Sequence, residues 1–409
     1  MLNKTNKIFF ISYYYNLPGA CQAEWASDRV DALNSLGHDV TVLTSFVSSK
    51  SNNKEKIIRI PSAGFKDARD EFSYYSQQNK PNFLEKCIFL FFTLVGLPFD
   101  LIIVLLTRKV GEGRWMWAIT AILRALFSPE LYKSDYIIST GGPASSHLAA
   151  IVLSKILQKK SMIELQDPMS GEGIGRDGSR GLLKKMEHFL LKHSSISVFV
   201  TRTAAMEASM KYKINNIDYI YPGAPSYNFS LKTKEKFDAI RMVHMGSLYG
   251  TRNLKNLIYA IQNLEDHQRE KFSISNIGHV DADIVNQESY GIKIDFLPHT
   301  TRDKAMKQAI KFDIMLLIQN TDGRSAATIP FKTYDYLQIG MPILALLNCN
   351  EELKEMLQSN GHIVADINSI DDISLKLKFI LETRLHPKIP LDLVPSEAAR
   401  KMIQLLNNL

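Results

Sequence analysis

Apolar and polar positions alternate in blocks through the first half of the chain. The short apolar runs KIFFIS and DVTVLT flank a segment in which Ala26, Val30 and Leu33 recur at helical spacing before Gly37 ends the pattern. The runs DYIIST, SMIEL, SISVFV and IDYIY continue the alternation, with helical segments between several of them. Repeated strand–helix units predict a parallel sheet with helices on both faces.

The pattern begins again after the turn YPGAP, with the runs IRMVHMG, FSISNIG, IKIDFLP, FDIMLLI and PILALL. A chain of 409 residues also exceeds the usual size of one hydrophobic core. We therefore predict two α/β domains, over residues 1–225 and 226–385. Residues 386–409 are expected to form a stiff linker and a last helix, capped by Ser396, that packs back toward the first domain.

One apolar run, residues 87–107 (CIFLFFTLVGLPFDLIIVLLT), does not fit this alternation. It is about as long as a membrane-spanning helix, but it contains Pro98 and the charged Asp100. A single crossing would also place strands of one sheet on opposite sides of the membrane. We therefore predict two short helical arms, broken at Gly96 to Pro98, that dip into one leaflet as a membrane-associated insertion. A buried helical hairpin beneath the first domain is the alternative.

Composition adds a preference for anionic partners. The chain carries 49 Lys and Arg against 42 Asp and Glu, a net charge of +7. Basic residues interleaved with tryptophans follow the apolar run and would suit lipid headgroups. The three cysteines are far apart and predict neither a disulfide framework nor a metal site. The N-terminal apolar run is too short for a signal peptide, so a cytoplasmic location is expected.

A turn of small residues stands between a strand and a helix in MGSLYGTRNLKNLIYAI. Gly246, Ser247 and Gly250 make the turn, and Arg252 is expected at the start of a helix from Asn253. Such a turn can direct backbone N–H groups at a phosphate, with the arginine adding charge. A structural turn with a surface arginine is the alternative.

A second motif, TIPFKTYDYLQIGMPILALL, places a polar loop and a helix before an apolar strand. Pro330 precedes the helix, where a phosphate would meet N–H groups beside Lys332. Asp335, one turn further on, is a candidate acceptor of hydrogen bonds from ribose hydroxyls. A surface helix with a Lys–Asp pair is the alternative.

Candidate acceptor-binding residues lie in the first domain. Asp167 ends the strand of SMIELQDP and is expected at the crevice where ligands of such sheets bind. The glycine-rich SGEGIGRDGSR that follows offers Arg176 to an acceptor phosphate. A loop-capping aspartate and a plain surface loop are the alternatives. Asp281 and Asp283 have the spacing of a metal-binding pair but lack supporting ligands, so no metal site is expected.

Taken together, these segments resemble glycosyltransferase family 4, a retaining group with the GT-B fold. The glycine, the basic residue six positions on and the block K-x-x-[DE]-Y-L-x-x-G-x-P-I match the family in order and spacing. YYYNLPGACQAEWASDRVDALNSLGHDVTVLTS is similar to its opening, IISTGGPASSHLAAIVLSKILQKKSMIELQDP to its middle and YPGAP to its interdomain turn. The resemblance implies two Rossmann-like α/β domains facing a central cleft.

By this resemblance, Gly246 and Arg252 bind the donor diphosphate, and Lys332 assists. Arg252 and Lys332 would supply the charge stabilisation of the leaving group, which is the main protein contribution to catalysis. Asp335 takes the place of a ribose-binding glutamate. Gly19 and Ala20 would approach the donor phosphates from the first domain.

The chain departs from the family pattern at two positions. Ala327 stands where the family has a glutamate that contacts the transferred sugar, and Ser247 stands in place of an arginine that also belongs to the donor-binding loop. A branch acting on bacterial surface polysaccharides is similarly altered, and the chain resembles that branch most.

The implied function is transfer of a hexosyl or N-acetylhexosaminyl unit from a nucleotide-sugar donor to a lipid-linked oligosaccharide. UDP is the commonest donor nucleotide in such families. The acceptor, a polyprenyl-linked glycan of O-antigen or capsule (surface-polysaccharide) biosynthesis, would be met at the cytoplasmic face of the inner membrane. No metal, other cofactor or nucleic acid is expected. A non-catalytic partner subunit of an assembly complex and a nucleotide-sugar epimerase of the same fold are the alternatives.

Overall fold

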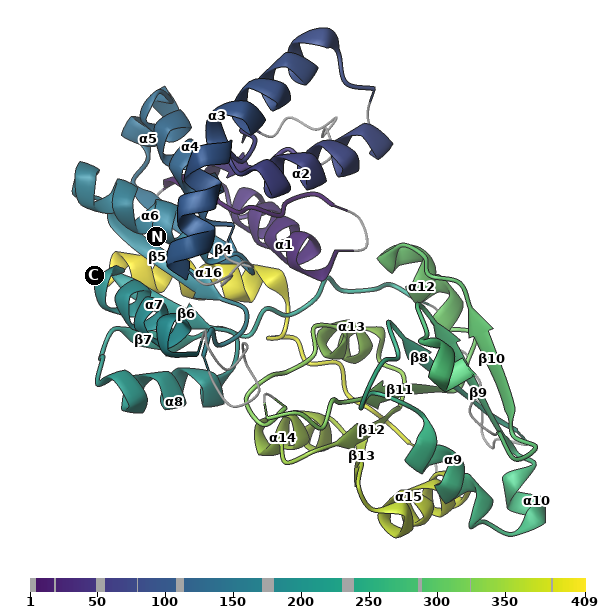
Figure 1. Cartoon of the computed structure of the whole chain (residues 1–409). Coiled ribbons are helices and arrows are strands. Elements are labelled where there is room, and N and C mark those ends of the chain that lie inside the picture. Colours follow the sequence, from purple (N-terminus) through teal and green to yellow (C-terminus); the bar gives the residue numbers. More distant parts are fainter. Residues whose placement is uncertain are drawn as a thin grey trace. The chain divides into compact units, whose positions relative to one another are not determined.

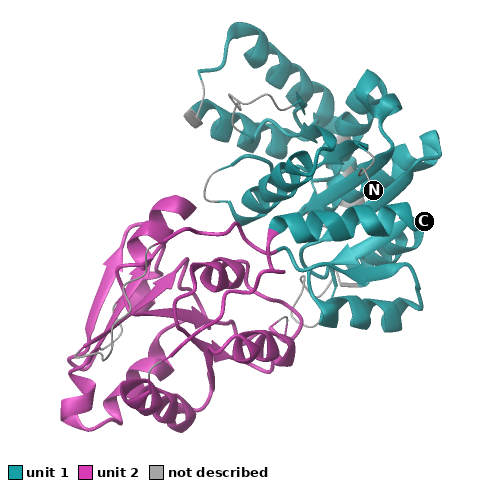
Figure 2. Cartoon of the chain, turned by 180° about the vertical axis from the view of Figure 1, so that it is seen from behind, with its two compact units in different colours: residues 1–222, 395–409 teal, residues 223–394 magenta. Residues whose placement is uncertain are grey.

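The computed structural model describes residues 5–17, 20–48, 56–78, 80–107, 114–170, 180–229, 239–285, 289–323, 325–383 and 385–409. It divides into two compact units (Figure 2). Unit 1 contains Met1–Pro222 and Pro395–Leu409, and unit 2 contains Gly223–Val394.

Unit 1 is built on a parallel sheet of seven strands in the order β3-β2-β1-β4-β5-β6-β7 (Figure 1). The strands are β1 (Lys7–Ile11), β2 (Asp39–Thr44), β3 (Lys56–Arg59), β4 (Tyr136–Gly141), β5 (Lys160–Leu165), β6 (Ile196–Phe199) and β7 (Ile217–Tyr219). The helices are α1 (Cys21–Ser35), α2 (Phe65–Gln78), α3 (Phe83–Thr107), α4 (Trp115–Leu126), α5 (Pro129–Lys133), α6 (Ala144–Leu157), α7 (Arg180–His193), α8 (Arg202–Tyr212) and α16 (Pro395–Asn407).

Along β1, successive apolar side chains point to opposite faces of the sheet, and helices cover both faces. Ile8 and Phe10 point to one face, where they share a core with residues of α1 and α16. Phe9 and Ile11 point to the other face and share a core with Trp117 of α4 and residues of α6. Successive side chains of a strand point to opposite faces, so a strand buried on both sides is continuously apolar.

The last helix belongs to unit 1, although it follows unit 2 in the chain. Its residues Ala399 and Met402 are fully buried. The helix begins at Pro395, so the expected cap residue Ser396 lies inside the first turn. Proline is favoured at the first helical position because the N–H that it lacks would have no partner within the helix.

The predicted break at Gly96 to Pro98 is wrong. From Phe83 to Thr107, α3 is one helix that continues through Pro98. A Cβ atom on Gly96 would overlap the carbonyl oxygen of Ala63. Gly96 is therefore a point of close approach between α3 and the chain before α2, rather than a breaker of the helix.

Only part of α3 is packed against its neighbours. Phe89 is buried against Phe46, Phe72 and Tyr75, with ring centroids 4.9 to 6.3 Å apart. Many other apolar side chains of the helix are exposed, namely Phe83, Leu84, Leu90, Phe91, Leu94, Val95, Leu97, Leu101 and Ile102. The alternative of a buried hairpin therefore does not describe α3.

Among the residues that the structure describes, no helix is both long and apolar enough to cross a membrane. The side chain of Asp100 lies outside the described part of α3. The membrane-associated insertion stays a prediction.

Unit 2 contains a parallel sheet of six strands in the order β10-β9-β8-β11-β12-β13. The strands are β8 (Ile240–Met245), β9 (Phe272–Ile277), β10 (Lys293–Leu297), β11 (Ile314–Ile318), β12 (Ile343–Leu347) and β13 (Ile363–Asp366). The helices are α9 (Lys255–Gln262), α10 (Asp266–Arg269), α11 (Ala282–Val285), α12 (Arg302–Ala309), α13 (Lys332–Ile339), α14 (Glu351–Ser359) and α15 (Ile370–Glu382). Its apolar core contains Ile240, Leu257, Leu316 and Leu377.

Candidate functional site

The strand order of unit 2 indicates a ligand site at the carboxyl ends of β8 and β11. The chain builds β8, β9 and β10 outward in one direction, then returns to place β11 beside β8 and continues to β13. Ligands of open α/β sheets bind where the strand order reverses. The segments that follow β8 and β11 therefore form the candidate site.

The segment after β8 opens with Gly246, which has a φ of +112°. Its N–H donates to the carbonyl oxygen of Ile277 at 2.8 Å. A Cβ atom added to Gly246 would have the Lys332 amine, 3.8 Å away, as its nearest neighbour. Ser247 follows and is half-buried. The two predicted motifs thus meet at this glycine.

Arg252 was predicted at the start of a helix. It lies instead in a tight hairpin before α9. The backbone groups of Tyr249 and Arg252 exchange two hydrogen bonds of 2.9 and 3.0 Å, with Gly250 at a φ of +52° between them. A glycine with positive φ at the first central position suits a type II′ turn. The hairpin places the Arg252 guanidinium 5.3 Å from the Tyr249 ring centroid.

Lys332 is half-buried and contacts residues of β8. Its amine donates to the carbonyl oxygen of Met245 at 3.1 Å and makes a short hydrogen bond to Nε2 of His244. Burial, and then the positive charge of Arg252, lower the pKa of Lys332 well below its usual value. Within the described residues, neither Lys332 nor Arg252 forms an ion pair with a carboxylate. Two basic side chains without an acidic partner favour an anionic ligand, whose charge would also favour the ammonium form of Lys332.

The start of α13 is less open to a phosphate than the sequence predicts. The N–H groups of Thr333 and Tyr334 donate to the carbonyl oxygens of Pro330 and Phe331 at 2.9 and 3.1 Å. Such tight turns are frequent where a helix begins. These two donors are therefore engaged within the chain.

Asp335 is almost completely buried and paired with Arg302, a residue that the sequence did not single out. The closest contact, from Nη2 of Arg302 to Oδ1 of Asp335, is 2.6 Å, and the Tyr227 hydroxyl donates to the same oxygen at 2.9 Å. Arg302 also lies 4.7 Å from the centroid of the Phe331 ring. Nothing in the local pattern around Arg302 signals this pairing. The ribose-binding role of Asp335 stays a prediction.

A shallow pocket lies beside the Arg252 hairpin at the same edge of the sheet. Its lining comes from the hairpin, the start of α9 and the segments after β11 and β13, and includes Thr251, Asn253, Lys255, Thr321 and Asn368. Ala327, the position of the missing family glutamate, is buried in the segment after β11. The site thus has polar groups from several loops at the carboxyl edge.

In unit 1, the corresponding reversal of strand order falls between β1 and β4. Asp167 is exposed, two residues beyond the end of β5. Its loop is held in place because the N–H of Met169 donates to Glu187 of α7 at 2.7 Å. Ala20 directly precedes α1, as its N-cap residue. Gly19 and Arg176 lie outside the described residues.

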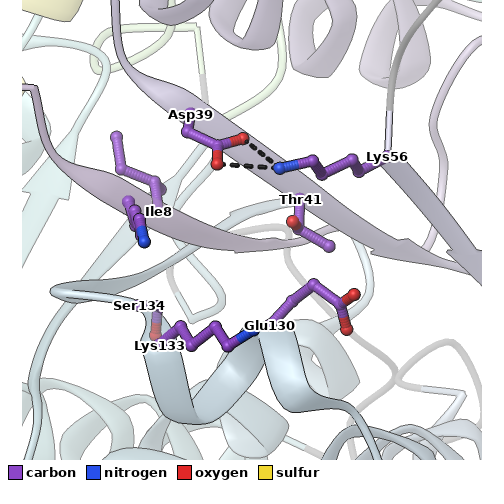
Figure 3. Close-up of a pocket in the computed structure, with 8 residues that line it drawn as sticks. Ile8, Asp39, Thr41, Lys56, Glu130, Lys133 and Ser134 are labelled. Atoms are coloured by element: carbon purple, nitrogen blue, oxygen red, sulfur yellow. Dashed lines mark hydrogen bonds and ion pairs between the residues drawn. The ribbon is translucent and has the colours of Figure 1, made fainter.

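A different pocket, shown in Figure 3, lies at the amino ends of the first sheet's strands. It is lined by Ile8, Asp39, Lys56 and Lys133, among others, and Lys56 donates to both carboxylate oxygens of Asp39 at 2.8 Å. The edge is opposite to the one where ligands of such sheets bind. The pocket is therefore not a candidate active site.

No metal-binding cluster of three or more His, Cys, Asp or Glu side chains is present in the described part of the chain. Asp281 of the suspected pair lies 3.5 Å from Nε2 of His279. Metal independence stays a prediction.

Comparison with solved structures identifies the fold. The chain is similar to the apo form of the lipopolysaccharide outer core galactosyltransferase WaaB, with 13% identity and a TM-score of 0.58, over 98% of this chain and 99% of that one. It is similar to Anabaena HepE in complex with UDP and glucose, with 11% identity and a TM-score of 0.56, over 98% and 95%. A Listeria monocytogenes protein assigned as UDP-N-acetylglucosamine 2-epimerase shares 10% identity and a TM-score of 0.52, over 99% and 96%.

The chain therefore has the GT-B fold, in which two Rossmann-like α/β domains follow each other. No protein-family model and no curated protein sequence matches the chain. At these identities the similarity establishes the fold alone. The reaction must be inferred from the residues of the candidate site.

Proposed function

We propose that the protein is a retaining glycosyltransferase that moves a sugar from a nucleotide-sugar donor to a lipid-linked glycan. The observation that carries this proposal is the position of the Lys332 amine beside Gly246 at the switch point of unit 2, where the charge of Arg252 also acts on it. Both cations lack a carboxylate partner among the described residues, so the diphosphate of a nucleotide-sugar would supply the missing negative charge.

The same cations suit the chemistry of transfer. As the glycosidic bond breaks, negative charge grows on the leaving diphosphate, and fixed positive groups stabilise that charge more in the transition state than in the ground state. The amine of Lys332 is held by His244 and Met245, and the backbone of Arg252 is fixed by its hairpin. We propose UDP as the donor nucleotide, in keeping with the UDP bound to HepE.

We propose a lipid-linked acceptor, with O-antigen or capsule (surface-polysaccharide) biosynthesis as the pathway, because α3 of unit 1 carries many apolar side chains that are exposed in the described part of the chain. Lys80 precedes α3 and Lys86 lies in its first turn, both exposed, and their charge would favour anionic headgroups. Peripheral contact with the cytoplasmic leaflet of the inner membrane would bring a polyprenyl-linked glycan to unit 1. In this proposal, Asp167 and Arg176 orient that acceptor.

The test is a titration of the purified protein with UDP, GDP and ADP, followed by turnover assays with nucleotide-sugars. We expect selective binding of one nucleotide, and sugar transfer only when a polyprenyl-linked glycan is present. Sugar interconversion without acceptor would instead favour an epimerase. Nucleotide-sugar binding without any turnover would favour a non-catalytic partner subunit, and no nucleotide binding would reject the donor site.

A further inference from the structure

The start of α6 is a feature of unit 1 that the proposed function does not use. This helix begins at Ala144, soon after the end of β4, and therefore lies at the carboxyl edge where the strand order reverses between β1 and β4. Its N-cap residue, Pro143, provides no side-chain hydrogen bond. The first N–H groups of a helix have no partner within the helix, so a ligand can supply one.

Three consecutive polar side chains in the first turn of α6 are buried, but only two of them have partners. Oγ of Ser146 accepts from the N–H of Tyr13 at 3.0 Å, and Nδ1 of His147 lies 2.9 Å from Oγ of Ser139. The hydroxyl of Ser145 is fully buried and has no hydrogen-bond partner among the described residues. A buried polar group without a partner costs free energy, so this hydroxyl is a candidate ligand contact.

Backbone donors lie beside the Ser145 hydroxyl. The Cα–Cβ bond of a helical residue tilts toward the start of its helix, so this hydroxyl is directed at the open end of α6. In the described part of the chain, the N–H groups of Ala144 and Ser145 make no hydrogen bond either, whereas the N–H of Ser146 donates to the carbonyl oxygen of Pro143 at 3.1 Å. Two N–H groups and one hydroxyl are therefore available together.

The neighbouring strand brings another donor to this place. Gly141 at the end of β4 pairs with Leu165 of β5, so the next residues along the two strands, Gly142 and Gln166, are neighbours. Gln166 is only 7% exposed, and its Nε2 has no hydrogen-bond partner among the residues that the structure describes. Gly142 is exposed, so the turn before α6 is open to solvent.

Gln22 of α1 lies over this turn. A Cβ atom on Gly142 would overlap the carboxamide of Gln22, so a glycine is needed for this approach. Gln22 is half-buried, and its amide can donate to a ligand at the turn. The start of α6 is thus accompanied by side-chain amides from two other elements.

We propose that the start of α6 is a binding site for a phosphate group. The available groups are N–H and O–H donors, a phosphate oxygen accepts, and the dipole of the helix favours negative charge at this end. The choice of phosphate rests on the proposed function, because a nucleotide-sugar and a polyprenyl-linked glycan both carry phosphate groups. The site adds a phosphate contact in unit 1 to the one proposed in unit 2.

Urea unfolding of the full-length protein, followed by tryptophan fluorescence, assigns the binding to unit 1. All the tryptophans of the chain lie in that unit. Inorganic pyrophosphate at matched ionic strength should raise the urea midpoint of the fluorescence transition, because a ligand that binds only the folded state stabilises it. An unchanged midpoint would overturn the inference, while calorimetry with UDP would still test the donor site by itself.

Ser145→Ala removes the hydroxyl and keeps the helix. Because alanine is the best helix former and no hydrogen bond within the protein is lost, the midpoint without ligand should stay the same or rise. The affinity for pyrophosphate should fall about tenfold, as for a lost hydrogen bond to a charged group. A lower midpoint without ligand would show that the hydroxyl has a partner within the protein, which contradicts the inference.

Ser154→Ala is the matched control on the same helix. Ser154 is also buried, but its hydroxyl donates to the carbonyl oxygen of Ile151 at 2.9 Å. This variant should bind pyrophosphate as tightly as the unmodified protein. Equal affinity for pyrophosphate in Ser145→Ala and the unmodified protein would mean an adventitious ion only, and would reject the site.

Two further titrations identify the substrate that supplies the phosphate. Geranyl diphosphate, a soluble prenyl diphosphate, is titrated into protein saturated with UDP. We expect Ser145→Ala to bind it about tenfold more weakly and to bind UDP normally, which assigns the site to the acceptor. A loss of UDP affinity in Ser145→Ala would assign the site to the donor diphosphate. If the unmodified protein binds no UDP, the proposed function fails, and the pyrophosphate measurements still decide whether the phosphate site exists.

Discussion

At the scale of single residues, positive charge at the candidate donor site comes from two side chains in different settings. Lys332 is held by residues 87 and 88 positions earlier in the chain. Arg252 is presented by a hairpin whose turn depends on Gly250. The charge of the site is therefore assembled from a local turn and a long-range contact.

Replacing Arg252 by Ala should weaken UDP binding by ~1.5 to 3 kcal/mol, the range for a hydrogen bond to a charged group. Calorimetry measures the loss, and Arg252→Lys should recover part of it because the charge returns without the fork geometry. Unchanged affinity in Arg252→Ala would show that the phosphates bind elsewhere.

Asp335 and Arg302 form a nearly buried pair, with side chains 3% and 13% exposed. Asp335→Asn should destabilise unit 2 by ~3 kcal/mol, because the guanidinium loses its charged partner. Urea unfolding followed by circular dichroism measures the loss. In the double variant with Arg302→Met, the loss should be smaller than the sum of the two single losses, and strict additivity would contradict a coupled pair.

A separate measurement tests the prediction that Asp335 accepts a hydrogen bond from the ribose. Asp335→Asn should weaken UDP more than 2′-deoxy-UDP if the carboxylate accepts from the ribose, because only the ribonucleotide loses a hydrogen bond. Equal losses for the two nucleotides would indicate that Asp335 pairs with Arg302 and does not bind the ribose.

At the scale of elements, a buried carboxyl group joins α2 to the end of β1. The Tyr13 hydroxyl donates to Glu71 at 2.6 Å, and the N–H of Ser62 donates to its second oxygen at 3.0 Å. Burial raises the pKa of Glu71 from 4.5 to about 8, against the opposing effect of these two hydrogen bonds. The protonated form is thus favoured by folding.

The sign of the resulting pH dependence follows from the raised pKa. Stability from Glu71 is fully present below its unfolded pKa and is lost as the pH rises through about 8. Relative to Glu71→Gln, the free energy of unfolding should fall by up to ~1.4 kcal/mol per pH unit between the ordinary pKa of 4.5 and the raised pKa of about 8. Urea unfolding of both proteins at several pH values measures the difference, and parallel pH profiles would contradict it.

The exposed apolar stripe of α3 gives a second prediction at this scale. Leu90, Leu94 and Leu101 share one face at 3.6 residues per turn, and all three are more than half exposed. Changing all three to Gln should reduce binding to anionic lipid vesicles more than about tenfold, because each buried leucine contributes ~1.5 to 3 kcal/mol. Flotation of the full-length protein with the vesicles measures binding.

Leu375→Gln with Phe379→Gln is the control, since these exposed side chains lie on α15 of unit 2. This change should leave flotation unaltered. Equal loss in both variants, or no flotation of the unmodified protein at all, would argue against membrane contact through α3.

At the scale of the whole molecule, the chain returns to unit 1 after completing unit 2. Residues of α16, including Ala399 and Met402, share a core with Val30 and Leu33 of α1. Unit 1 therefore needs the C-terminal segment, whereas His244, Arg252 and Lys332 lie wholly within unit 2.

Truncation after Val394 should destabilise unit 1 by several kcal/mol, about the loss for uncovering three or four buried apolar side chains. The three tryptophans, Trp25, Trp115 and Trp117, all lie in unit 1, so their fluorescence in urea follows that unit alone. UDP binding should persist in the truncated protein. A loss of UDP binding without a shift in the fluorescence transition would contradict the assignment of the C-terminal helix to the core of unit 1 and of UDP binding to unit 2.

Much of the fold could be predicted from the sequence because its signals are local. Continuous apolar runs alternate with helical periodicity, and this is the pattern of parallel strands buried on both faces. The edge strands β3 and β13 were not predicted, since they are only four residues long and partly exposed. The two motifs that contain Gly246 and Lys332 follow neighbouring strands, so their approach at one edge of the sheet could be predicted, whereas their role in donor binding stays a prediction.

By itself, the sequence determined the two α/β units and the residue types at the edge of the second sheet, because both depend on order and spacing along the chain. Only the tertiary structure decided that Asp335 pairs with Arg302, that His244 supports Lys332 and that Gly96 packs against Ala63. Each of these contacts joins segments distant in sequence. Partners of this kind are selected by packing, which no local pattern of apolar and polar positions records.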